Sequence, residues 1–146
     1  MATTVNFYDD ADDSLLKFAV IIAEANGKSV FCKHRLRDTY EVPGGHREPN
    51  ESIEETARRE LYEETGALDF TIVPVCVYSV VRDGNTASPS YGKLFYAQIS
   101  AFEPDLHSEI EKITLTDKMP TALTYPDIQP FLIDEARRRG FFVSCR

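Results

Sequence analysis

The sequence has few cysteines, and those it has are not arranged for metal binding or cross-linking. There are three cysteines, an odd number, and they are widely spaced: Cys32, Cys76 and Cys145. No CxxC pair occurs, and the histidines show neither mutual spacing nor cysteine partners for a zinc site: His34, His46 and His107. We therefore expect reduced thiols in the protein core rather than disulfides, a redox centre or a zinc site.

Basic residues are also scarce. Lysine and arginine total 16 against 24 aspartate and glutamate residues, giving a formal net charge of -8 and a pI near 4.9. Duplex nucleic-acid binders normally need a basic surface, so this balance disfavours nucleic acid as a partner. A phosphorylated small molecule would need cations that are supplied locally at its site.

Long apolar runs are missing as well. None approaches the roughly 20 residues of a membrane span, and the N-terminus has acids where a signal peptide has basic and then apolar residues. We expect a cytoplasmic protein without a membrane partner. The length suits one domain over residues 1–146, and the sequence does not indicate an oligomeric state.

The N-terminal half predicts a β-hairpin in a sheet that has helices on both faces. Residues 1–13 are polar and acidic, and we expect a solvated arm or turn there. The apolar run 15–23 and the β-rich run 28–33 flank Asn26-Gly27, a strong two-residue turn signal. Because the first run is apolar throughout, both faces of its sheet should be covered by helices.

The C-terminal half predicts two strands and a closing helix. The expected elements are strands over 70–81 and 93–101 and a helix over 128–139. Pro74 should lie at an edge, a bulge or a strand end. Residues 82–91 form the longest predicted loop, and residues 102–118 form an acidic, mixed segment without a clear period.

The most unusual stretch is residues 45–67, with seven glutamates in twenty-three residues. The Pro43-Gly44-Gly45 turn before it permits a backbone that most residues could not adopt. Asn50 or Ser52 is the expected N-cap, and Ser52 with Glu55 matches a capping box. Gly66 is the expected C′ residue, so we predict a helix of about 14 residues.

Three glutamates of this helix, Glu60, Glu63 and Glu64, lie at positions i, i+3 and i+4 and so share one face. That face continues the apolar stripe that begins at Ile53, where an ordinary amphipathic helix would stay apolar. Unpaired like charges there would each cost several kcal/mol. The cluster therefore needs a positive partner.

Spacing alone leaves three explanations open. Clustered carboxylates and a carbonyl from the Gly44-Gly45 turn would suit a hard divalent cation such as Mg²⁺ or Mn²⁺. Arg59 and the neighbouring arginines could instead neutralise the cluster. The helix could also be a solvated one, braced by the i,i+4 pairs Glu54–Arg58 and Glu55–Arg59.

The stretch resembles the signature of the Nudix hydrolase family, G-x5-E-x7-R-E-U-x-E-E-x-G-U, where U is a bulky aliphatic residue. Eight of its nine constrained positions are filled here, by Gly45, Glu51, Arg59, Glu60, Leu61, Glu63, Glu64 and Gly66. Ala67 is smaller than the usual last residue. The preceding Tyr40-Glu41-Val42-Pro43-Gly44 also resembles the lead-in common in this family.

The resemblance implies an α+β fold, the Nudix-type α/β/α sandwich, in which a mixed sheet carries the box helix and a C-terminal helix. It implies hydrolysis of a diphosphate linked to another moiety. The carboxylates of Glu60, Glu63 and Glu64 and the carbonyl of Gly45 would hold Mg²⁺ or Mn²⁺. Arg59 would hold a glutamate of the box in place, and Glu51 would pin the loop.

The resemblance leaves the general base open between Glu63 or Glu60 in the box and an acid from a later segment. The later candidates are Glu103, Glu109 and Glu111. Flanking cations could meet phosphates or serve as surface charges: Lys33, Arg35, Arg37 and Arg47. Aromatic residues could stack on a base or belong to the core: Tyr40, Tyr78, Tyr91, Phe95 and Tyr96.

The favoured substrate is a nucleoside triphosphate, in intact or oxidised form, cleaved to a monophosphate and pyrophosphate. Enzyme alternatives are a nucleotide sugar, a dinucleoside polyphosphate or the 5′-triphosphorylated end of an RNA. A non-catalytic module that senses a nucleotide is an alternative of a different class. Retention of every acid of the box favours catalysis over sensing.

Overall fold

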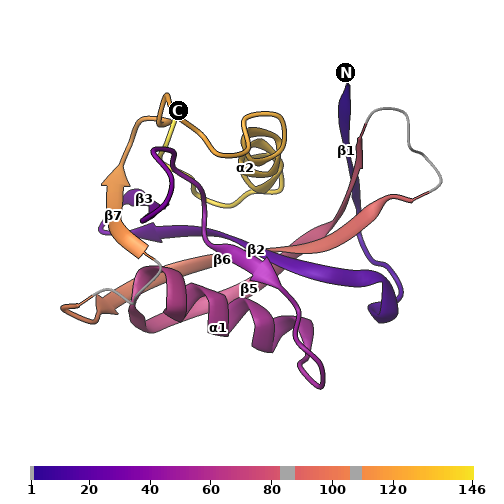
Figure 1. The fold of residues 1–146 in the computed structure, drawn as a ribbon, viewed down its shortest axis with the longest axis horizontal. Helices are drawn as coiled ribbons and strands as arrows, with labels where there is room; N and C mark the ends of the chain where they lie inside the picture. Colours follow the sequence, from indigo (N-terminus) through magenta and orange to yellow (C-terminus); the bar gives the residue numbers. More distant parts are fainter. Residues whose placement is uncertain (1, 83–87, 106–109) are drawn as a thin grey trace.

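A mixed sheet with a helix on each face makes up the computed structural model, which describes residues 2–82, 88–105 and 110–146 (Figure 1). The strands are β1 (Thr3–Tyr8), β2 (Leu16–Ala25), β3 (Lys28–His34), β4 (Gly44–His46), β5 (Ala67–Arg82), β6 (Ser90–Phe102) and β7 (Ile110–Thr116). The helices are α1 (Ile53–Thr65) and α2 (Gln129–Arg138), and Asp13–Leu15 form a single 3₁₀ turn. The predicted α/β/α sandwich is confirmed.

The strand order is β1-β5-β6-β2-β3-β7, and β4 pairs with β2 outside this path. Strands β2 and β6 are parallel, and the other described pairs are antiparallel. One edge of β2 is shared by two strands: β3 pairs with its C-terminal end, and β4 pairs with its residues 18–20. The chain before α1 is thereby held against the centre of the sheet.

Alternate residues of the central strands supply two separate cores. Ile21 packs in the cluster that contains Leu61 of α1, whereas its neighbour Ile22 packs in the cluster that contains Leu132 of α2. On β6, Phe95 belongs to the first cluster and Leu94 to the second. Since strand side chains alternate between faces, this arrangement confirms that helices cover both faces of the sheet.

Local signals in the sequence place the β2–β3 turn and the ends of α1. Asn26 and Gly27 have φ values of 53° and 74°, as a tight hairpin turn requires. The Ser52 hydroxyl accepts the Glu55 N–H at 3.0 Å, and the Glu55 carboxylate accepts the Ser52 N–H at 2.8 Å, completing the capping box. Gly66 ends the helix in the left-handed conformation with a φ of 75°.

Two edge strands differ from the prediction. Residues 3–8 form β1 rather than a solvated arm, and they show the alternating half-burial of an edge strand on β5. Residues 110–116 of the acidic segment form β7, which pairs with β3. Both strands are short and half exposed, so their pairing depends on distant partners that give no local sequence signal.

The other predicted strands are present but longer, since β5 and β6 extend over 67–82 and 90–102. Arg82, Ser90 and Tyr91 therefore belong to strands and not to the predicted loop over 82–91, of which residues 83–87 lie outside the described range. Residues 44–46, predicted as a turn, form the short strand β4 because they pair with β2.

A register shift between Pro74 and Cys76 in the β5–β6 pair places Pro74 at a bulge. Helix α2 lies within the predicted range of 128–139. No helix in the described part of the chain combines the length and apolar character that a membrane crossing requires.

Candidate functional site

The loop before α1 is pressed between the sheet and the helix. Ile21 donates its backbone N–H to the Pro43 carbonyl at 2.9 Å, and the β4 register places Gly45 opposite Ala19. A Cβ atom on Gly45 would lie 1.9 Å from Oε2 of Glu60, and one on Gly44 would lie 2.6 Å from the Ala19 carbonyl oxygen. A side chain on Gly44 would meet backbone atoms, so only glycine fits there, whereas one on Gly45 would displace the Glu60 carboxylate, which lies directly against the loop.

Arg59 connects the loop with the acidic face of α1. Its guanidinium forms a two-pronged pair with Glu51, through Nε to Oε2 at 2.7 Å and Nη2 to Oε1 at 3.0 Å. Its Nη1 lies 3.0 Å from Glu63 Oε1 and 3.3 Å from Glu60 Oε2, and Nη2 donates to the His46 carbonyl. This fork geometry is specific to arginine, which fixes the glutamates as well as neutralising them.

Glu51 holds the loop in the way that the resemblance implies. Its carboxylate accepts the Glu48 N–H at 3.1 Å and the Thr56 hydroxyl at 2.7 Å in addition to the Arg59 pair. The hydrogen bonds from Arg59 are the main reason that the pKa of Glu51 is lowered to about 2. The same contacts raise the pKa of Arg59, so this ion pair is charged at all ordinary pH values.

The three glutamates of the cluster differ in exposure and in contacts. Glu64 is buried, and its Oε1 accepts the Gly44 N–H at 2.8 Å. The Glu60 side chain is 15% exposed and the Glu63 side chain 47% exposed. Glu60 and Glu64 therefore face the Gly44–Gly45 segment, whereas Glu63 lies at the solvent edge beside Arg59.

These contacts bear on the three explanations for the glutamate cluster: a divalent cation, neutralisation by arginine, or a solvated helix braced by ion pairs. Arg59 supplies some of the positive charge that the cluster needs, as the second explanation requires. The predicted surface pair Glu54–Arg58 forms at 3.1 Å, but Glu55 caps the helix instead of pairing with Arg59. Glu64 lies close to a different group, since its Oε2 is 3.0 Å from Nε2 of His34 on β3.

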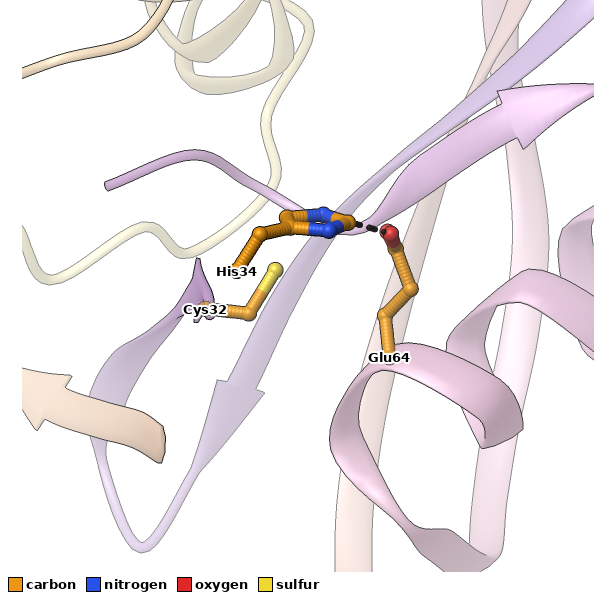
Figure 2. Close-up of side chains that lie close together, drawn as sticks. All are labelled: Cys32, His34 and Glu64. Atoms are coloured by element: carbon orange, nitrogen blue, oxygen red, sulfur yellow. Dashed lines mark ion pairs between the residues drawn. The ribbon is translucent and has the colours of Figure 1, made fainter. Parts of the chain in front are cut away.

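A metal-binding type of cluster surrounds Glu64 (Figure 2). Ligand atoms of Cys32, His34 and Glu64 all lie within 4.8 Å of one another, and His34 Nε2 is 3.0 Å from Glu64 Oε2. The expectation that no cysteine partners a histidine is wrong for this pair. Alternate residues of a strand share a face, so the Cys-x-His spacing on β3 was the signal that could have revealed it.

A cleft of about 270 Å³ opens beside the loop, between the sheet and α2. Its walls include the apolar side chains of Phe18, Val20, Tyr78, Val80 and Leu132. Gly44, Gly45 and His46 line the end of the cleft nearest the glutamates, and Glu60 lies against Gly45. The cleft therefore adjoins the acidic cluster.

Polar residues that the sequence did not single out also line this cleft. Arg82 comes from the end of β5, Tyr125 from the segment before α2, and Gln129 from the start of α2. Gln129 is buried, and its side-chain oxygen accepts the Val42 N–H at 2.9 Å. These residues are distant from one another in the sequence, and no motif links them.

Most flanking cations have structural partners. Lys33 pairs with Glu111 at 3.1 Å, Arg37 with Glu41 at 2.8 Å and Arg47 with Asp13 at 2.9 Å. Among the aromatic candidates, three are buried in the core: Tyr78, Phe95 and Tyr96. Tyr78 also lines the cleft.

The later acids have separate positions. Glu103 accepts the Tyr62 hydroxyl at 2.9 Å. Tyr62 is two residues from both Glu60 and Glu64, so it points about 160° away from each of them around the helix. Glu111 lies on β7 with Lys33. Glu109 lies outside the described residues.

Comparison with known proteins identifies the family to which the chain belongs. The NUDIX domain family matches residues 14–131. A Bacillus subtilis (strain 168) protein, provisionally described as the 8-oxo-dGTP diphosphatase YtkD, is 41% identical over 63 residues. That match covers 43% of this chain and 39% of YtkD, so the chain spans well under half the length of this relative.

Solved structures share the fold over a larger part of the chain. The Bacillus subtilis pyrophosphohydrolase BsRppH has a TM-score of 0.76 at 24% identity, covering 95% of this chain and 93% of its own. A UDP-X diphosphatase has a TM-score of 0.70 at 18% identity, covering 93% and 68%. The chain belongs to the NUDIX domain family, whose enzymes generally use divalent metals such as Mg²⁺ or Mn²⁺.

Proposed function

We propose that the protein is a divalent-metal-dependent pyrophosphohydrolase that cleaves a nucleoside triphosphate, in intact or oxidised form, to a monophosphate and pyrophosphate. The observation that carries the proposal is the contact between the apolar cleft and the acidic cluster of α1. Gly45 lines the cleft on one side and meets the Glu60 carboxylate on the other. A nucleoside in the cleft would thus bring its phosphates to the glutamates.

The donor atoms fit a hard divalent cation. Glu60, Glu63 and Glu64 and the carbonyl of Gly45 offer only oxygen, which Mg²⁺ and Mn²⁺ prefer, and we assign these four residues to the metal. When bound, the ion would neutralise phosphate oxygens, orient the diphosphate and lower the pKa of water. It would also complete the charge compensation that Arg59 provides in part.

The protein groups have separate roles in this proposal. Glu60 lies where the cleft meets the acidic cluster, so it is better placed than the exposed Glu63 to accept a proton from the attacking water. Arg59 holds Glu60 and Glu63 in position, and Glu51 fixes Arg59. The N–H of Gly44 orients Glu64 through its hydrogen bond.

Two observations support a nucleotide as the substrate. The cleft volume of about 270 Å³ is near the lower end of the usual range for small-molecule sites, and its walls are largely apolar. Tyr78 and Phe18 supply aromatic surface, and Gln129 and Arg82 supply polar groups for recognition. The partial match with YtkD points to a purine nucleoside triphosphate, with the oxidised base as one form.

The test is a panel of substrates assayed with purified protein and Mg²⁺ or Mn²⁺. It contains nucleoside triphosphates, oxidised purine nucleotides, ADP-ribose, nucleotide sugars, dinucleoside polyphosphates and a 5′-triphosphorylated RNA. We expect the fastest turnover with a purine nucleoside triphosphate, with pyrophosphate as the product and no reaction in EDTA. Preferred turnover of another class would overturn the substrate assignment, and binding without turnover would favour a nucleotide sensor.

A further inference from the structure

Two neighbouring side chains of β3 and one of α1 form a ligand set of a different chemical kind from the oxygen donors of the box. Figure 2 shows the sulfur of Cys32 beside the ring of His34, with Glu64 reaching toward them from α1. Their ligand atoms lie within 4.8 Å of one another. Donors bound to one tetrahedral ion lie roughly 3–4 Å apart, so displacements of the ligand atoms by about 1 Å would bring this set together.

A fourth donor lies next to the set. Oε2 of Glu41 is 3.7 Å from His34 Nε2, while the other oxygen of Glu41 is held by Arg37 at 2.8 Å. Glu41 is buried and also lines the cleft, which gives an ion a route from solvent. Thiolate sulfur, imidazole nitrogen and carboxylate oxygen are each ligand types that Zn²⁺ binds, and Glu41 would supply the fourth position of a tetrahedral site.

One ring nitrogen of His34 lacks a well-formed hydrogen bond within the described residues. Nε2 of His34 is buried and makes no hydrogen bond of good geometry with any residue in the described ranges, although Glu64 Oε2 is 3.0 Å away. Buried polar atoms are normally hydrogen-bonded, so a missing partner calls for an explanation. A histidine–carboxylate pair explains the short contact, and the adjacent Cys32 thiol donates to the Glu41 carbonyl at 3.4 Å, so both β3 side chains already face the same pair of glutamates.

We propose that Cys32, His34, Glu64 and Glu41 form a site for a borderline-soft divalent ion of the Zn²⁺ class, and that its occupation inhibits the enzyme by removing Glu64 from the Mg²⁺ site. The inhibition rests on the proposed function, whereas the binding does not. Imidazole and thiolate select Zn²⁺ over Mg²⁺, so the two sites differ in ligand chemistry while sharing one carboxylate.

Binding at this site releases one proton. The Cys32 thiol is fully buried, and that burial, with the charges of Glu64 and Glu41, raises its pKa well above the usual range. The thiol is therefore neutral without the ion. When the S–H bond breaks and the sulfur–metal bond forms, the proton leaves to solvent, and the thiolate charge is balanced by the cation.

Co²⁺ titration of the purified protein without added metal tests the binding directly. Co²⁺ takes the place of Zn²⁺ and gives a near-ultraviolet charge-transfer absorption when it is bound to thiolate. We expect this absorption in the wild type and in the control Cys76→Ala, and its loss in Cys32→Ala. Zn²⁺ should displace Co²⁺, and Zn²⁺ affinity should fall at least about 10-fold in Cys32→Ala and in His34→Gln.

Absence of the absorption in the wild type, or its persistence in Cys32→Ala, would overturn the site. Thermal unfolding of each variant shows whether it is folded. His34→Gln keeps the thiol, so it tests the site independently if Cys32→Ala does not fold. Unchanged Zn²⁺ affinity in a folded His34→Gln protein contradicts the ligand set.

Zn²⁺ titration into the Mg²⁺-supported reaction tests the inhibition. The wild type and Cys76→Ala should be inhibited, and Cys32→Ala should keep its Mg²⁺-supported rate but need at least about 10-fold more Zn²⁺ for the same inhibition. Equal inhibition of Cys32→Ala would contradict the shared-carboxylate account. A cobalt–thiolate signal without turnover of any nucleotide would leave the metal site standing and would reject the proposed function instead.

Discussion

At the scale of single residues, Arg59 and Gly45 organise the acidic cluster. Arg59 contacts Glu51, Glu60 and Glu63, and the missing side chain of Gly45 leaves the space that the Glu60 carboxylate occupies. The identity of these residues is readable from the sequence because the motif constrains them at fixed spacing. The partner of Glu64 is not readable in this way, because His34 comes from a strand thirty positions earlier.

The Glu51–Arg59 pair should make stability depend on pH in the acidic range. The folded-state pKa of Glu51, about 2, is below its ordinary value of 4.5, so its contribution is present above about pH 4.5 and is lost as the pH falls toward 2. Urea unfolding at several pH values should show a fall in unfolding free energy over this window that is smaller in Glu51→Gln.

Glu54→Gln is the matched control, since Glu54 also pairs with an arginine but lies on the exposed face. Exposed pairs contribute little, so this variant should keep the pH dependence of the wild type. The same acid slope in Glu51→Gln and the wild type would show that Glu51 does not carry the effect.

At the scale of elements, the local signals were sufficient for α1 and for the β2–β3 hairpin. The capping box, the Gly66 terminus and the Asn26-Gly27 turn each act within a few residues, and each is present in the structure. The edge strands β1 and β7 were missed because they are defined by pairing with β5 and β3. Their half-polar sequences do not indicate a strand without those partners.

The capping box should contribute measurably to stability. Ser52→Ala removes the oxygen that accepts the Glu55 N–H, and loss of an N-cap typically costs about 1 kcal/mol. The free energy of unfolding from urea denaturation should fall by about this amount, whereas Ser52→Thr should change it little because the hydroxyl is retained. Equal values for Ser52→Ala and the wild type would mean that the packing of α1 alone sets its start.

At the scale of the whole molecule, the sandwich brings the acidic cluster and the cleft together. The cleft takes residues from β2, β5, the segment before α2 and α2 itself, which meet only because β2 lies at the centre of the sheet. The fold class followed from the apolar runs and the motif. The composition of the cleft did not, since residues such as Arg82 and Gln129 are ordinary in their local sequence.

The net charge of -8 is also a property of the whole molecule. An acidic molecule that acts on a polyanion must concentrate positive charge at the site, and a bound divalent ion does this where the protein itself carries mainly carboxylates. Arg82 borders the cleft, and Lys33, Arg37 and Arg47 pair with acids elsewhere.

The most direct measurement of the central claim is the rate of pyrophosphate release from the best nucleotide of the panel, with and without Mg²⁺. Glu63→Gln and Glu64→Gln should each lower the Mg²⁺-supported rate by at least about 10²-fold. Glu54→Gln on the exposed face of the same helix should leave it unchanged. Unchanged turnover in both Glu63→Gln and Glu64→Gln would contradict the assignment of the acidic cluster to metal-dependent catalysis.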